Sequence, residues 1–161
     1  MRLLAFSLLA ATSLAHAAPP SGIVLDDLRV SASSATGKCG QASVSISEVS
    51  PRPPSGEVNL VGINATITMQ QGARTLEVAG ENPDTGFYLQ DINRLHCLAT
   101  PKGPRVIVGG YCLARMCVPA DYIVIDPATL KVLSKPVDEV CEEECAEKAL
   151  GIPLPKQLSV Y

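Results

Sequence analysis

The sequence predicts a mainly β domain, built as an antiparallel meander or a sandwich-like sheet, stabilised by disulfides and with one C-terminal α-helix packed on it. Three observations favour this fold class. The 161 residues include 13 Pro and 12 Gly, which divide the chain into short runs typical of sheets with many turns. The clearest run alternates apolar and polar residues with a period of two. A helical period follows only near the C-terminus.

The N-terminal segment has the pattern of a secretory signal peptide. Arg2 precedes the apolar stretch Leu3–Leu14, and Ala15 and Ala17 supply the small residues that signal peptidase requires. The apolar stretch is shorter than the roughly 20 residues that span a bilayer. We therefore expect residues 1–17 to be removed and residues 18–161 to form a single exported domain without a transmembrane anchor. It would be periplasmic in a Gram-negative bacterium and secreted otherwise.

The first half of this domain contains four predicted strand regions. Strands are expected at Ile23–Val30 and Ala42–Val49. The clearest strand is Val61–Met69, in which every odd-numbered residue is apolar. Gln70–Ala73 has the composition of a turn, so Arg74–Ala79 is predicted as its hairpin partner.

The second half contains five short apolar runs separated by turns rich in Pro, Gly and Asp. These runs predict strands at Phe87–Leu89, Arg94–Ala99, Arg105–Gly109, Tyr122–Ile125 and Leu130–Leu133.

The helix is predicted over about residues 137–150. Asp138 and Glu139 would lie in its first turn, where the helix dipole favours negative charge. Gly151 is typical of a helix C-terminus, and Pro153 prevents continuation.

Six cysteines lie after the signal peptide, and an even number in an exported protein favours disulfides. Their spacing matches no common zinc pattern, so neither a metal nor another cofactor is predicted. Cys112 and Cys117 would close a short loop between two strands, while Cys141 and Cys145 lie one helical turn apart, at about 6 Å. That leaves Cys39 to pair with Cys97. The alternative links the helix cysteines to Cys112 and Cys117, because sequence alone does not define connectivity.

Catalytic motifs are missing from the sequence. His96 is the only histidine after the signal peptide, and it precedes Cys97 in a predicted strand, where adjacent side chains point to opposite faces. We interpret His96 as a half-buried or edge-strand residue. No motif of a serine hydrolase, zinc protease or nucleotide-binding loop is present. A non-enzymatic protein is therefore favoured. Paired carboxylates, for example Asp121 with Asp126 or any Glu of the predicted acidic helix, leave an atypical small hydrolase as an alternative.

The most distinctive candidate for binding is the segment between Cys112 and Cys117. A disulfide there would order a loop that carries Leu113, Arg115 and Met116, and preorganisation lowers the entropic cost of binding. In the alternative interpretation, the two apolar side chains pack into the core.

The composition also restricts the partner. Because 13 Lys and Arg face 16 Asp and Glu, the chain lacks the basic surface of a nucleic-acid binder. The leading hypothesis is an exported, non-enzymatic protein that binds another protein of unknown identity, with inhibition of a hydrolase or immunity to a toxin as candidate roles. The alternatives are a structural or accessory subunit of an envelope assembly and the small hydrolase named above.

Overall fold

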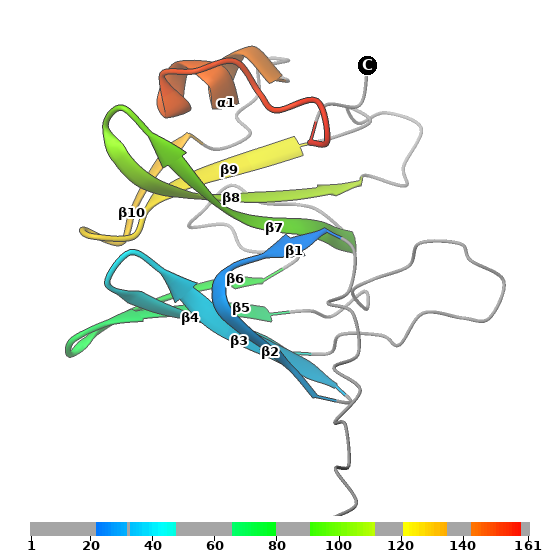
Figure 1. Cartoon of the computed structure of the whole chain (residues 1–161), viewed down its shortest axis with the longest axis vertical. Coiled ribbons are helices and arrows are strands. Elements are labelled where there is room, and N and C mark those ends of the chain that lie inside the picture. Colours follow the sequence, from blue (N-terminus) through cyan, green and yellow to red (C-terminus); the bar gives the residue numbers. More distant parts are fainter. Residues whose placement is uncertain are drawn as a thin grey trace, which may run out of the picture.

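The computed structural model describes residues 22–31, 33–47, 66–79, 91–111, 121–134 and 143–158. Its strands form two five-stranded sheets, called here the upper and lower sheet after their places in Figure 1. The upper sheet consists, in spatial order, of β1 (Ile23–Val24), β7 (Asp91–Thr100), β8 (Gly103–Tyr111), β9 (Asp121–Asp126) and β10 (Lys131–Ser134). The lower sheet consists of β2 (Asp26–Val30), β3 (Ser34–Cys39), β4 (Ala42–Ser47), β5 (Thr66–Gln71) and β6 (Arg74–Ala79). The single described helix is α1 (Glu143–Leu150).

The molecule has three layers. The two sheets stack face to face, and α1 lies on the outer face of the upper sheet, over β9 and β10 (Figure 1). All recorded strand pairs are antiparallel except the short parallel pair of β1 and β7. The predicted fold class is therefore confirmed: a mainly β, sandwich-like fold with one helix near the C-terminus.

Period-two alternation builds the core between the sheets. In β4 the side chains of Ala42, Val44 and Ile46 are buried, and the serines between them face outward. Ile67 and Met69 in β5 are buried in the same way, as the alternation predicted. The upper sheet contributes Ile92, Leu95, Val106, Val108, Ile123 and Ile125 from the opposite side.

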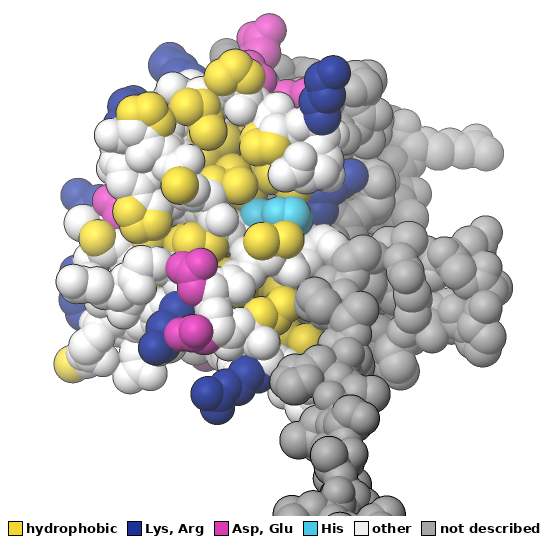
Figure 2. Space-filling model, viewed as in Figure 1, with side chains coloured by type: hydrophobic (Ala, Val, Ile, Leu, Met, Phe, Trp, Pro, Cys, Tyr) yellow, Lys and Arg dark blue, Asp and Glu magenta, His cyan; other side chains and the backbone are white. Residues whose placement is uncertain are grey.

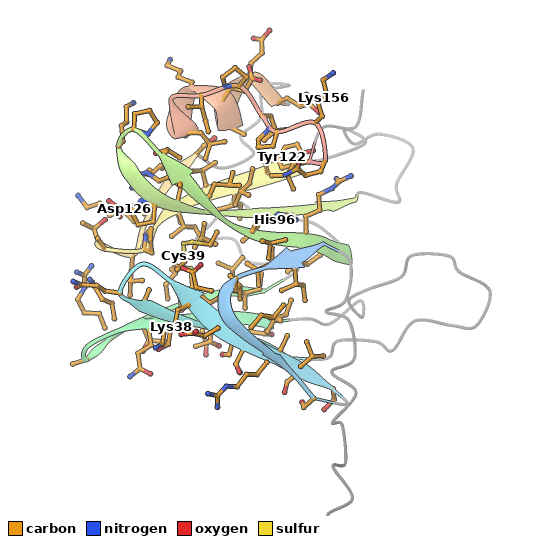
Figure 3. All side chains as sticks on the ribbon, in the orientation of Figure 1. Lys38, Cys39, His96, Tyr122, Asp126 and Lys156 are labelled. Atoms are coloured by element: carbon orange, nitrogen blue, oxygen red, sulfur yellow. A yellow bond between two sulfur atoms is a disulfide. The ribbon has the colours of Figure 1, made fainter. Side chains whose placement is uncertain are left out.

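A disulfide joins the two sheets through this core. Cys39 at the end of β3 is bonded to Cys97 in β7, with Cα atoms 5.3 Å apart, and Figure 3 places Cys39 between the layers. This predicted pair is confirmed. Cys145 in α1 is also disulfide-bonded, but its partner falls outside the described residues. The pairing of Cys145 with Cys141, and the alternative to it, therefore remain predictions.

The expectation of one strand over Ile23–Val30 was wrong. The chain forms β1 at the edge of the upper sheet, crosses over at Leu25, and forms β2 at the edge of the lower sheet. Leu25 is buried in the core. It lies so close to Gly37 of β3 that a Cβ atom on that glycine would come within 2.6 Å of the Leu25 Cβ. The crossing thus depends on a glycine in the neighbouring strand.

Of the other strands, three hairpins were predicted correctly and one strand was missed. The hairpins β5–β6, β7–β8 and β9–β10 form where predicted. β3 was not predicted at all, because only Ala35 and Cys39 in it are buried. The expected strand Phe87–Leu89 lies outside the described residues, as do residues 48–49 and 61–65 of two others.

The helix ends where the sequence indicated. α1 stops at Leu150, and Gly151 follows with φ 74°, donating its N–H to the Glu147 carbonyl at 2.7 Å. Residues 137–142 of the predicted helix lie outside the described residues.

Candidate functional site

The predicted binding loop is not among the described residues. Leu113, Arg115 and Met116 lie between 111 and 121, together with Cys112 and Cys117. β8 ends at Tyr111 and β9 begins at Asp121, and these two strands are antiparallel neighbours. The binding-loop hypothesis assumed that residues 112–117 connect two neighbouring strands, and β8 and β9 are such neighbours. The disulfide and the binding role of this segment remain predictions.

His96 is buried in the upper sheet. It lies in β7, which pairs with β1 on one side and β8 on the other, and it is only 5% exposed. The half-buried or edge-strand interpretation was therefore wrong. Burial, and secondarily the positive charge of Arg94, lower the pKa of His96 to about 4, so the ring is neutral near pH 7.

His96 and Cys97 face opposite sides of the upper sheet, as adjacent strand residues must. Cys97 points toward the lower sheet in its disulfide with Cys39. In Figure 2 the imidazole of His96, in cyan, lies next to hydrophobic side chains and beside a basic one. His96 is therefore not placed to activate Cys97.

Over β8 and β9 the outer face of the upper sheet is covered by the C-terminal part of the chain. Its strands contribute Ile107, Tyr122 and Val124 to an apolar cluster. The chain folded over them contributes Ala146, Leu150, Leu154 and Leu158.

Two hydrogen bonds hold this covering segment in place. The Tyr122 hydroxyl donates to the carbonyl of Leu158, and the Leu154 N–H donates to Glu147 Oε1 at 2.8 Å. Figure 3 shows Tyr122 beneath this segment, near Lys156. The part of the upper outer face over β8 and β9 is thus used for internal packing.

The outer face of the lower sheet has the opposite character. None of the described elements packs on it (Figure 1), and most of its side chains are exposed. Register places polar residues in rows across the strands. One row is Thr36–Ser45–Thr68–Glu77 and the next is Lys38–Ser43–Gln70–Thr75.

A hollow of about 380 Å³ lies in this face, called here the serine-floored hollow. It is lined by Asp27, Arg29, Thr36, Gly37, Lys38, Ser43, Val44, Ser45, Thr68 and Gln70. The central strand β4 presents only short serine side chains outward, whereas β2, β3 and β5 present longer ones. The floor is therefore lower than the walls, and this difference follows from the alternation of β4.

Charged groups lie along one wall of the hollow. Lys38 Nζ lies 3.4 Å from Asp27 Oδ2, and both side chains are exposed. The register between β2 and β3 shifts between Asp26 and Arg29, and Asp27 has a left-handed backbone with φ 52°. Such irregularities reorient side chains at sheet edges, and here both Asp27 and Arg29 line the hollow.

The lining offers hydrogen bonds and charge. The hydroxyls of Thr36, Ser43, Ser45 and Thr68 can each donate and accept. Within the described ranges, no three His, Cys, Asp or Glu side chains are grouped so that they could hold a metal ion. The arrangement is suited to binding a polar surface or chain.

Sequence analysis missed this site. The signal was available in Ser43, Ser45 and Ser47, which occupy every outward position of β4. Such alternation marks the face of a strand, but the neighbours that form the walls come from residues distant in sequence.

No helix in the described part of the chain is long and apolar enough to cross a membrane. The chain matches no known protein family, no curated protein and no solved structure.

Proposed function

We propose that this chain is an exported, non-enzymatic protein that binds another protein, and that the outer face of the lower sheet is its contact surface. One observation carries the proposal: the two outer faces of the sandwich differ in the polarity of their side chains and in whether another element packs on them. Over β8 and β9 the upper face is apolar and covered by α1 and the segment after it, whereas the lower face carries rows of hydroxyl and amide groups that no described element covers.

The composition of the lower face favours a protein partner over a small molecule. Small-ligand sites are mostly apolar and bury most of their ligand. The serine-floored hollow is instead lined mostly by hydroxyl, amide and charged side chains, and it lies in a broad sheet face. Protein interfaces accept such surfaces, because direct and water-mediated hydrogen bonds give them specificity.

Two features support export. The first 17 residues have the pattern of a signal peptide. The disulfide between Cys39 and Cys97 fits an oxidising compartment, since disulfides form and persist there.

Site-specific photo-crosslinking tests the proposal. A benzophenone amino acid in place of Ser45 samples the hollow, and the same probe in place of Leu133, which is 43% exposed on the upper sheet, is the matched control. We expect a discrete covalent product with one protein in the native exported fraction from position 45 and none from position 133.

A third probe at Arg115 tests the predicted loop in the same experiment. A product from position 115 alone would move the contact surface to the Cys112–Cys117 segment. No product from either position 45 or position 115 would contradict protein binding at both surfaces.

A further inference from the structure

We propose that the serine-floored hollow receives an extended acidic segment of the partner, with one carboxylate held by Arg29. This inference rests on the proposed function, and it assigns the chemistry of the partner's contact segment.

Arg29 is the cation in the hollow that is free to bind a ligand anion. Lys38 is already paired with Asp27 at 3.4 Å, so these two charges offset each other. For Arg29 the structure records no ion pair with any described residue, and its side chain is exposed. The charges lining the hollow therefore leave one guanidinium unbalanced. Its planar fork matches a carboxylate through two parallel hydrogen bonds.

A row of hydroxyls continues from Arg29 across the sheet. Register places Arg29 opposite Thr36, Thr36 opposite Ser45, and Ser45 opposite Thr68. Neighbouring strands are about 4.8 Å apart, so four strands span roughly 14 Å. That is the length of about four residues of extended chain at about 3.4 Å each.

These hydroxyls suit a peptide backbone. Each can donate to a carbonyl or accept from an N–H, which are the groups that an extended chain presents at short intervals. Ser45 Oγ makes only a long hydrogen bond of 3.4 Å to the Thr68 carbonyl, which a better partner can replace. Arg29 then sets which side chain is accepted, and the row accommodates the backbone beside it.

The test is an NMR titration of the oxidised protein, residues 18–161, with two capped pentapeptides, Gly-Ser-Asp-Ser-Gly and its Asn counterpart. We expect the Asp peptide to shift the backbone amide signals of Thr36, Ser45 and Thr68. It should bind about tenfold or more tightly than the Asn peptide, because a hydrogen-bonded charge is at stake. Raising the salt concentration should weaken it, since the pair is exposed.

Variants assign the effect to Arg29. R29Q should reduce binding of the Asp peptide to the level of the Asn peptide, and R29K should give an intermediate affinity. The control K131Q removes an exposed charge from the upper sheet and should bind like the parent protein. Unchanged spectra away from the hollow would establish that each variant is folded.

Three outcomes would overturn the inference: equal binding of the Asp and Asn peptides, no shift at the hollow with either peptide, or tighter binding of D-glucuronate than of the Asp peptide. The photo-crosslink from position 45 separates this failure from that of the proposed function. If the crosslinked product persists in R29Q, recognition of an acidic segment by Arg29 is refuted and protein binding is retained. If the product is lost in R29Q but not in K131Q, the inference is supported.

Discussion

The two sheets have similar inner faces and contrasting outer faces. Both direct Val, Ile, Leu and Met side chains into the shared core. On the outside, the upper sheet presents Ile107, Tyr122 and Val124 to the helical layer, and the lower sheet presents Ser43 and Ser45 to the surroundings. The sandwich core needs only the inner faces. The outer faces are therefore where the sequence distinguishes a face that is packed against the helical layer from one that no described element covers.

The sequences of two strands, β9 and β4, show the difference between the covered and the uncovered outer face. Tyr122–Ile125 in β9 is a continuous apolar run with every residue buried, which is typical of a strand covered on both faces. Ala42–Ser47 in β4 alternates strictly, which is typical of a strand covered on one face. The contrast between these two patterns yields the predictions that follow.

The largest expected effect concerns the covalent link between the sheets. Replacing both Cys39 and Cys97 by Ala opens a crosslink between residues 58 apart in sequence. The loss of the constraint on the unfolded chain should lower the free energy of unfolding by about 4 kcal/mol. Urea unfolding of the oxidised proteins measures it. A decrease below about 1 kcal/mol would mean that packing alone holds the two sheets together.

A pair of swaps tests the outer faces directly. Val124→Ser on the covered face removes two buried methyl groups and buries a hydroxyl, so the free energy of unfolding should fall by about 3–4 kcal/mol. Ser45→Val on the other face should change it by less than about 0.5 kcal/mol. Thermal and urea unfolding of both variants check this. Similar losses in the two would show that the lower face is also packed against something.

The buried histidine adds a pH dependence to the covered sheet. The pKa of His96 falls from 6.5 in the unfolded chain to about 4 in the folded protein, so the unfolded chain binds the proton more readily. Its contribution to stability is therefore complete above about pH 6.5 and is lost as the pH falls toward 4. At about 1.4 kcal/mol per pH unit, the loss approaches about 3 kcal/mol.

Urea unfolding from pH 7 to pH 4 measures this loss, with His96→Gln as the comparison. The variant should show a shallower decline with falling pH than the parent protein, whatever its stability at pH 7. Parallel curves would contradict a buried, neutral His96.

Patterns within short stretches of sequence predicted the strands, hairpins and helix end that neighbouring residues determine. The alternation around Ile67 and Met69 gave a strand and its hairpin partner, and Gly151 gave the end of the helix. β3 was missed because its residues are mostly small or polar, with only Ala35 and Cys39 buried. The position of β3 is set by its pairing with β2 and β4, and the sequence of β3 alone does not indicate these partners.

The same limit applies to the crossing at Leu25 and to the candidate site. The segment Ile23–Val30 contains no Pro or Gly to mark a break, so its sequence does not show that its two halves belong to different sheets. The hollow depends on Ser45 lying opposite Thr36 on one side and Thr68 on the other, which is a matter of register. Outward serines could be predicted, and the walls beside them could not.

The smallest expected effect concerns the bond that holds the cover on the upper sheet. Tyr122→Phe removes the hydroxyl that donates to the Leu158 carbonyl while keeping the ring, which lies against Gly109. One lost hydrogen bond at a buried carbonyl should lower the free energy of unfolding by about 1 kcal/mol. Because the bond joins β9 to the chain after α1, the loss should appear first as faster amide exchange at Leu154 and Leu158, with exchange in β4 unchanged. The control Tyr122→Leu also removes the ring and should cost more. If exchange rises equally in both sheets, the cover is part of one cooperative unit with the core, and the difference between the two outer faces is one of chemistry alone.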